Sequence, residues 1–363
     1  MRNKTITIIG AGNGGQAIAG YAAICGYDVC LYNRTLSNID KIKDNKRIIL
    51  TGVIENTGIL SKVTDNLKEA IEFSDIIMVV TVANAHNELA TEMAPFLRKN
   101  QIILLNPGRT GGVLEFKNIF QKLNVPFLYI AEAQTLIYAC RLLDVGVVNI
   151  IGIKDKVLIS SDTFYHTEFV IKKLSDLYTC FIPADNLLQT SLENIGAIFH
   201  PCVVMFNAAA IERGESFYFY RDMTPQIAEF IHKVDKERLE IGKAFGVSLI
   251  SAEEWVSYAY PNISFGNGLC EKMKNNPAYY NIKAPSSIYT RQLFEDIPTG
   301  LVPMSELGKL ANVNVKLIDS IITVCSALLN ENFREKGRTL ASLGLDNFTY
   351  TDIINYFRSN DAI

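Results

Sequence analysis

The chain has 363 residues, enough for two domains, and its formal net charge of −3 gives no sign of a nucleic-acid partner. Hydrophobic residues make up 48% of it and charged residues 20%, as in ordinary globular proteins. The longest apolar runs have strand length, far below the roughly 20 residues of a membrane helix. Thr5 and Thr7 interrupt the first apolar run, unlike a signal peptide. We therefore expect a cytoplasmic protein with no membrane partner.

Cysteine and histidine usage gives no metal or disulfide signal. The seven cysteines are an odd number without a C-x-x-C pair, and the four histidines are scattered. We expect no metal site, and free thiols of the kind found in a reducing compartment.

The chain opens on a strand, a glycine turn and a helix. A β-branched run over residues 4–9 leads into glycines at positions 10, 12 and 15, and a helical stretch follows over 16–25. In this pattern Gly10 makes the bend, Gly12 lets the backbone approach a ligand, and Gly15 lets the helix pack on the strand. The helix amides then face a pyrophosphate. We predict a dinucleotide site here, which also includes Asn13 and Gly14.

The end of the second predicted strand bears on the choice of cofactor. Enzymes that use NAD usually carry an acid there, whereas this chain has Asn33, Arg34 and Thr35 after the strand at 27–32. Arg34 would attract a 2′-phosphate, and its neighbours can donate hydrogen bonds to it. This favours NADPH. If Arg34 is only a solvated loop cation, these residues do not distinguish between the two coenzymes, and NADH is possible.

Strands and helices alternate through the first half of the chain, which predicts an α/β fold with a parallel, Rossmann-type sheet covered by helices on both faces. Apolar runs that indicate strands or hairpin arms lie at 47–53, 58–63, 75–81, 101–105, 127–131, 147–153 and 157–160. Helical patterns lie at 67–73, 84–97, 113–123 and 163–178.

A second glycine loop, residues 106–112, follows a predicted central strand. Ligands bind at the carboxyl ends of strands in such sheets, so Pro107 and Gly108 are candidate cofactor residues. Thr81, which ends a neighbouring predicted strand, is placed with them. The alternative is a structural turn that begins the next helix.

The pattern changes near residues 183–185, where helical periodicity takes over. We expect a dinucleotide-binding domain over 1–184 and a mostly α-helical substrate domain over 185–363. The clearest helical stretches are 189–210, 224–245, 304–330 and 351–358.

One candidate for proton transfer stands out in the helical domain. His200 lies in a helical context directly before Pro201, and proline should kink or end the helix there, so that the imidazole projects. Histidine transfers protons near neutral pH without special tuning. The alternative is a hydrogen-bonded core histidine.

The stretch 289–303 groups an arginine, two acids, two prolines and a glycine in what reads as a loop. Arg291 is a bidentate donor suited to a substrate carboxylate, and Asp296 can orient His200 and raise its pKa. The alternative is a turn between helices with a surface ion pair.

The chain resembles the octopine/nopaline (opine) dehydrogenases over essentially its whole length. The resemblance rests on the first glycine turn, Asn106-Pro107-Gly108 with Gly111-Gly112 and Leu114-Glu115, Glu132 with Tyr138-Ala139-Cys140-Arg141, Asn194 with His200-Pro201, and Arg291 with Glu295-Asp296-Ile297-Pro298 and Gly300-Leu301-Val302-Pro303.

The resemblance implies a two-domain enzyme with its active site in the cleft between the domains. Such enzymes use NAD(P)H to condense an α-amino acid with a 2-oxo acid, commonly pyruvate. It implies that His200 transfers the proton, that Asp296 is its partner and that Arg291 anchors the oxo-acid carboxylate. The family often has His-Arg-Tyr around this arginine, where this chain has Thr290-Arg291-Gln292, which bears on substrate preference.

The amino-acid pocket is less well defined. Asn194 can touch substrate or nicotinamide, or it can cap a helix. Trp255, Tyr258 and Tyr260 form an aromatic group that can line the pocket, and Tyr258 is our candidate substrate residue. Ordinary helix packing is the alternative.

Two other functions stay open from the sequence. One is a simple 2-oxo acid or 3-hydroxy acid reductase of the 6-phosphogluconate-dehydrogenase-like group, many of which have a lysine where this chain has Thr190. The other is a non-catalytic NADPH-binding protein. We expect the partners to be small molecules, an amino acid and a 2-oxo acid, and the chain to be a monomer or homodimer.

Overall fold

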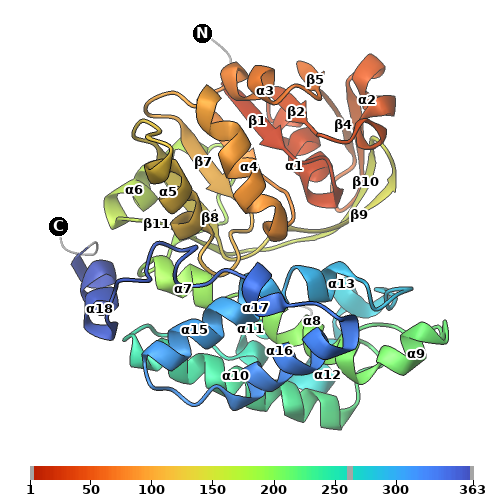
Figure 1. Ribbon diagram of the computed structural model, residues 1–363. Coiled ribbons are helices and arrows are strands. Elements are labelled where there is room, and N and C mark those ends of the chain that lie inside the picture. Colours follow the sequence, from red (N-terminus) through yellow and green to blue (C-terminus); the bar gives the residue numbers. More distant parts are fainter. Residues whose placement is uncertain (1–3, 260–264, 360–363) are drawn as a thin grey trace. The chain divides into compact units, whose positions relative to one another are not determined.

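The structure is a computed structural model that describes residues 4–259 and 265–359 and divides into two compact units (Figure 1). The first unit comprises the chain up to Gly108 together with Gly112–Ala184. The second comprises the chain from Asp185 onward together with Arg109–Gly111, the middle of the second glycine loop. Among the described residues, no helix is both long and apolar enough to cross a membrane.

The first unit is built on an eight-stranded sheet with the order β12-β11-β8-β7-β6-β1-β2-β5. Neighbouring strands are parallel, except that β8 and β11 are antiparallel. Apolar residues fill the central strands, and all four residues of β7 are buried. The predicted Rossmann-type sheet is therefore confirmed, with one antiparallel pair added. Its strands are β1 (Thr5–Ile9), β2 (Asp28–Tyr32), β5 (Lys62–Thr64), β6 (Ile76–Val79), β7 (Ile102–Leu105), β8 (Tyr129–Ala133), β11 (Val157–Ser161) and β12 (Phe181–Pro183).

The strand order reverses at β1, which lies between β2 and β6. Ligands of open α/β sheets bind outside the carboxyl ends of the strands at such a reversal. The turn after β1, the residues after β2 and the loops after β6 and β7 all leave the sheet at this edge.

The helices of the first unit alternate with the strands as expected. Figure 1 shows α4 and α5 side by side against the sheet. The helices are α1 (Asn13–Ile24), α2 (Asp40–Asn45), α3 (Leu67–Phe73), α4 (His86–Met93), α5 (Gly112–Lys122) and α6 (Phe164–Leu174), with short 3₁₀ turns at Leu36–Asn38, Ala83–Ala85 and Ala94–Phe96.

A second, four-stranded sheet has the order β4-β3-β10-β9. It comprises β3 (Arg47–Gly52), β4 (Asn56–Ile59), β9 (Tyr138–Asp144) and β10 (Val147–Ile153). The expected hairpin arm at 58–63 is divided, because β4 pairs with β3 whereas β5 joins the main sheet beside β2. The strand β9 was not predicted, since its polar residues break any continuous apolar run.

The second unit is helical, as predicted. Its helices are α7 (Leu187–Leu192), α8 (Ile195–Phe206), α9 (Ala208–Glu212), α10 (Pro225–Ala244), α11 (Ala252–Ala259), α12 (Gly268–Asn275), α13 (Pro277–Tyr280), α14 (Arg291–Phe294), the π-helical turn η4 (Ile297–Leu301), α15 (Val302–Leu310), α16 (Lys316–Leu329), α17 (Phe333–Lys336) and α18 (Tyr350–Ser359).

The helix that carries His200 does not stop at Pro201, so that part of the prediction is wrong. Helix α8 continues to Phe206, with Phe199, Pro201 and Cys202 among its buried residues. A proline inside a helix costs about 3 kcal/mol. Burial of several apolar side chains, each contributing about 1.5–3 kcal/mol, outweighs that cost.

The stretch 289–303 is also not a loop. It forms α14, the π-helical turn η4 and α15 in close succession. Pro298 and Pro303 lie in the first turns of η4 and α15, where a missing N–H costs no helix hydrogen bond. The prolines therefore mark helix starts.

Candidate active site

The glycine turn of the first unit has the close approaches that its sequence predicted. Gly10 has φ +106°, and a Cβ there would lie 2.7 Å from the Val80 carbonyl oxygen. A Cβ on Gly15 would lie 1.7 Å from the oxygen of Gly10. A Cβ on Gly12 would meet nothing within 4 Å, so the backbone there is open to a ligand.

The amino end of α1 lacks a side-chain cap, which leaves its amides available to a phosphate. Asn33, after β2, stabilises the turn by accepting a hydrogen bond from the Ala11 N–H at 2.9 Å. The side-chain oxygen of Asn13 accepts from the Leu142 N–H at 2.7 Å. Gly14 packs closely under Leu136.

Arg34 and Thr35 follow Asn33 at the end of β2. The guanidinium of Arg34 is exposed and pairs with Glu88 at 2.9 Å. The Thr35 carbonyl accepts from the Asn33 side chain at 2.9 Å. An exposed pair such as Arg34–Glu88 contributes little to stability and can be exchanged for another anion.

Buried polar atoms lie at the ends of two central strands. Within the described part of the chain, the Thr81 hydroxyl and both amide atoms of Asn106 are buried and have no hydrogen-bond partner. Pro107 and Gly108 follow Asn106, and the Gly108 N–H donates to the Ala133 carbonyl. With the open glycine turn, these atoms fit a dinucleotide that lies across the sheet edge.

The second unit brings His200 and Asp296 together. The His200 Nδ1 lies 2.6 Å from the Asp296 Oδ2, and the two side chains are 15% and 1% exposed. The His200 Nε2 lies 2.8 Å from the hydroxyl of Tyr220. The imidazole is thus hydrogen-bonded on both sides, with a carboxylate that can hold one tautomer.

Charge around Asp296 keeps this acid ionised. Burial raises the pKa of Asp296, but the nearby charges of His200 and Arg109 outweigh burial and bring that pKa below its ordinary value. An ionised Asp296 can only accept, so the His200 Nδ1–H donates to it across the 2.6 Å contact.

Arg109 is a site residue that the sequence reasoning missed. Its Nε lies 3.4 Å from Glu295, and its Nη1 lies 3.5 Å from Asp296 and 3.2 Å from the Asn194 Oδ1. Burial alone lowers the pKa of Arg109, but Glu295 and Asp296 raise it above its ordinary value, so the guanidinium stays charged. An arginine within a glycine-rich loop after a central strand was the available signal.

Gly196 lies where the side chains of Arg109, His200 and Asp296 converge. A Cβ on Gly196 would be 2.9 Å from the Arg109 Nη1, 3.2 Å from the His200 Cε1 and 3.4 Å from the Asp296 Oδ1. Gly196 precedes His200 by one turn of α8, so the absence of a side chain lets the guanidinium approach the imidazole.

Arg291 and Asn194 both contact the cluster formed by Arg109, His200, Glu295 and Asp296. The Arg291 Nη1 contacts the Glu295 Oε2 at 3.2 Å, and the Arg291 side chain is 54% exposed, which leaves donors for another anion. Asn194 accepts from Arg109, and its Nδ2 donates to the Thr110 hydroxyl at 3.3 Å. Asn194 therefore positions Arg109.

Tyr258 lies on α11 near Glu193, which precedes Asn194 in the chain. Burial, and then the charge of Glu193, raises the pKa of Tyr258. Tyr258 is thus linked electrostatically to Glu193, the residue before Asn194 in the chain. Tyr260 lies outside the described residues.

Glu193 predicts a pH-dependent stability. Its Oε1 accepts from the Ile250 N–H at 3.0 Å, while its Oε2 is buried, and burial raises its pKa to about 7. The folded protein keeps a proton that the unfolded chain releases as the pH rises from about 4.5 to 7, so stability falls over this range. Glu193→Gln should raise the free energy of unfolding by about 2–3 kcal/mol at pH 8 and by little at pH 4.

Denaturant titrations at both pH values, followed by the fluorescence of Trp255, the single tryptophan of the chain, test this. The exposed Glu240→Gln is the matched control and should change stability at neither pH. An equal gain for Glu193→Gln at pH 4 and pH 8 would contradict the assignment.

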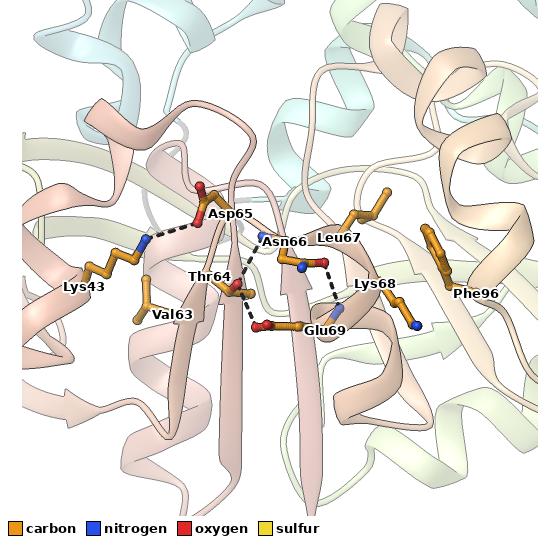
Figure 2. Close-up of a pocket in the computed structure, with 9 residues that line it drawn as sticks. All are labelled: Lys43, Val63, Thr64, Asp65, Asn66, Leu67, Lys68, Glu69 and Phe96. Atoms are coloured by element: carbon orange, nitrogen blue, oxygen red, sulfur yellow. Dashed lines mark hydrogen bonds and ion pairs between the residues drawn. The ribbon is translucent and has the colours of Figure 1, made fainter.

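Figure 2 shows a separate hollow of the first unit, where β5 ends and α3 begins. Its polar lining is largely paired: Lys43 contacts Asp65 at 3.1 Å, and the Asn66 side chain accepts from the Glu69 N–H at 3.3 Å. It contains none of the predicted site residues. The lining residues are Lys43, Val63, Thr64, Asp65, Asn66, Leu67, Lys68, Glu69 and Phe96.

Two family models match the chain. Residues 183–329 match the α-helical domain of the NAD/NADP octopine/nopaline dehydrogenases. Residues 5–110 match the N-terminal region of NAD-dependent glycerol-3-phosphate dehydrogenase. The two matches cover parts of the two compact units.

Curated relatives match over nearly the whole chain. The opine dehydrogenase of Arthrobacter sp. (strain 1C) is 34% identical over 355 residues, which cover 97% of this chain and 98% of that protein. The vitopine synthase of Allorhizobium ampelinum is 25% identical and covers 89% of each chain.

Solved structures share the fold. Octopine dehydrogenase with NADH and L-arginine has a TM-score of 0.79 at 18% identity, covering 97% of this chain and 98% of that chain. Yersinopine dehydrogenase with NADP⁺ bound has a TM-score of 0.70 at 14% identity, covering 98% and 99%. A ketopantoate reductase from Ralstonia eutropha JMP134 has a TM-score of 0.62 at 15% identity, covering 92% of this chain and 99% of that chain. The fold is therefore also found in a protein described as a ketopantoate reductase.

Proposed function

The chain belongs to the NAD(P)-dependent opine dehydrogenase family, oxidoreductases that act on CH–NH groups, and we propose that it condenses an α-amino acid with pyruvate using NADPH. The observation that carries the proposal is the Asp296–His200 pair at 2.6 Å, beside two arginines in the helical unit. A proton donor next to cationic groups suits the condensation of an anionic oxo acid with an amine.

The coenzyme would be held by the turn at Gly10–Gly15, the residues after β2, and the buried polar atoms after β6 and β7. When bound, the reduced nicotinamide supplies the hydride.

His200 is proposed to supply the proton that lets the oxygen of the oxo acid leave as water. Its Nδ1 is held by Asp296, which fixes the orientation of the ring. Its Nε2 is then the nitrogen from which the proton departs.

Arg291 is proposed to bind the carboxylate of the oxo acid. One of its terminal nitrogens is engaged by Glu295, and its half-exposed side chain retains further donors. Binding by a guanidinium fixes the orientation of the carbon that is to be reduced.

An assay of amine dependence tests the proposed reaction. We expect NADPH oxidation with pyruvate to depend strongly on an added amino acid, when the twenty amino acids are tested against several 2-oxo acids with each coenzyme. Oxidation with the oxo acid alone, unchanged by any amine, would instead indicate a simple reductase. Coenzyme binding without oxidation across the whole panel would indicate a non-catalytic protein.

The preference for NADPH is proposed from Arg34, whose weak exposed pair with Glu88 can be exchanged for a 2′-phosphate. Arg34→Ala should raise the KM for NADPH by about tenfold, the usual value of a charged hydrogen bond, and should leave the KM for NADH nearly unchanged. Steady-state kinetics with both coenzymes measure this. Arg98→Ala, which breaks the exposed pair with Asp75, is the matched control. Equal effects on both coenzymes would remove Arg34 from the 2′-phosphate site.

A further inference from the structure

Tyr220 occupies the side of His200 that the proposed reaction uses. The phenol oxygen lies 2.8 Å from the His200 Nε2, while Asp296 holds the Nδ1 of the same ring. A carboxylate, an imidazole and a phenol thus form one hydrogen-bonded row. Any proton that leaves through Nε2 in this arrangement reaches the Tyr220 oxygen first.

Backbone hydrogen bonds fix the segment that carries Tyr220. The Phe219 N–H donates to the Ile282 carbonyl at 2.8 Å, and the Ala284 N–H donates to the Phe217 carbonyl at 2.9 Å. Tyr218 and Lys283 form an antiparallel bridge between the same two segments. Phe219, which precedes Tyr220, is therefore held by the backbone of the neighbouring segment. This fixes the position from which Tyr220 contacts His200.

Side chains hold the ring of Tyr220 as well. It packs on Tyr279 with ring centroids 4.8 Å apart, and it lies edge-on to Phe219 at 4.8 Å. The Tyr220 side chain is almost fully buried. A buried phenol packed in this way keeps a fixed direction for its hydroxyl.

The charge of Arg109 acts on the phenol of Tyr220. Arg109 and Tyr220 interact electrostatically, and Arg109 is the buried guanidinium that also contacts Asp296. A guanidinium stabilises a transient phenolate through charge attraction in a site from which water is excluded.

Building on the proposed condensation, we propose that Tyr220 is a catalytic residue that passes the proton from His200 to the oxygen of the oxo acid. This goes beyond the His200 and Asp296 pair, because it assigns the group that touches the departing oxygen.

The proton moves along this row as the C–O bond of the substrate breaks. The amine adds to the 2-oxo carbon to give a neutral carbinolamine. Its C–O bond then breaks as the Tyr220 O–H gives its proton to the hydroxyl, which leaves as water. The nitrogen lone pair forms the C=N bond of an iminium cation, and the phenolate takes the Nε2 proton of the His200 imidazolium. The positive charge has moved from His200 to the substrate nitrogen, where it favours acceptance of a hydride.

Tyr220→Phe tests this, because it keeps the ring packing and removes only the hydroxyl. We expect kcat to fall by about tenfold to a hundredfold, within the range of general acid catalysis, with unchanged affinity for NADPH and a modest fall in melting temperature from the lost hydrogen bond to His200. Tyr218→Phe, on the same segment but in contact with Arg221, is the matched control and should keep wild-type kcat.

A second variant separates proton transfer from packing. Difluorotyrosine at position 220 keeps the ring and the hydroxyl but lowers the phenol pKa, so the alkaline limb of the kcat–pH profile should move to lower pH. A purely structural hydroxyl would leave this limb in place.

The outcomes separate the two proposals. Wild-type protein without amine-dependent oxidation of NADPH would overturn the proposed function itself. An active wild type with Tyr220→Phe within twofold of its kcat, or faster, would overturn only the role of Tyr220. An active wild type with a slow Tyr220→Phe and a displaced pH limb in the fluorinated protein supports the relay.

Discussion

The His200→Ala variant is expected to lose at least about a hundredfold in kcat, the usual contribution of a general acid, while it binds NADPH as the wild type does. The imidazole lies 2.6 Å from Asp296 and 2.8 Å from Tyr220, so its removal interrupts proton transfer between these groups. The coenzyme residues belong to the first unit and should be unaffected. Stopped-flow measurement of the single turnover, with NADPH affinity measured separately, tests both parts.

The chain supplies a matched control. His166 also pairs with an aspartate, since its Nδ1 lies 2.7 Å from the Asp162 Oδ1, but the pair belongs to the first unit and to no predicted site. His166→Ala should keep wild-type kcat. Because residues that act as a unit are not additive, Asp296→Asn combined with His200→Ala should be little slower than His200→Ala alone. A near-normal single turnover for His200→Ala would remove His200 from proton transfer.

Arg109→Met is expected to destabilise the protein by about 3–5 kcal/mol, because it leaves two buried carboxylates side by side without their shared counter-charge. Glu295 and Asp296 are 3% and 1% exposed, and Arg109 contacts both. Methionine fills much of the volume of arginine, so the expected loss is mainly electrostatic. Denaturant unfolding followed by the fluorescence of Trp255 in α11 reports on the helical unit that contains the cluster.

The exposed pair between Arg213 and Glu215 provides the comparison for Arg109. These groups lie 2.7 Å apart, closer than Arg109 lies to either of its carboxylates, yet both side chains are more than half exposed. Arg213→Met should therefore change stability by less than about 1 kcal/mol. Similar losses for the two variants would show that burial does not govern the Arg109 cluster.

The features that local sequence patterns predicted are those whose causes lie within a few residues. The glycine turn follows from the close approach of Gly15 to the Gly10 carbonyl, five residues away, and the alternation of strands and helices follows from periodicity. The β9 strand, by contrast, is stabilised by pairing with β10, and its own residues show no apolar run. Helix α8 continues through Pro201 because of tertiary packing, which no local rule contains.

The candidate site shows the same contrast between features that are recognisable in the sequence and features that depend on tertiary contacts. His200, Asp296 and Arg291 were predicted from their residue types and from the resemblance to a family, and the structure places them in one cluster. Arg109 lies 187 residues before Asp296, and only the folded chain shows that the two meet. Tyr220 is one of 16 tyrosines, and nothing in its local sequence distinguishes it from the others.

The condensation can be followed by mass spectrometry of the product formed from pyruvate, an amino acid and NADPH that carries deuterium at the transferred position. We expect a secondary amine that contains the nitrogen of the amino acid and one deuterium on the former 2-oxo carbon. Deuterated lactate beside an unchanged amino acid would contradict the proposed condensation.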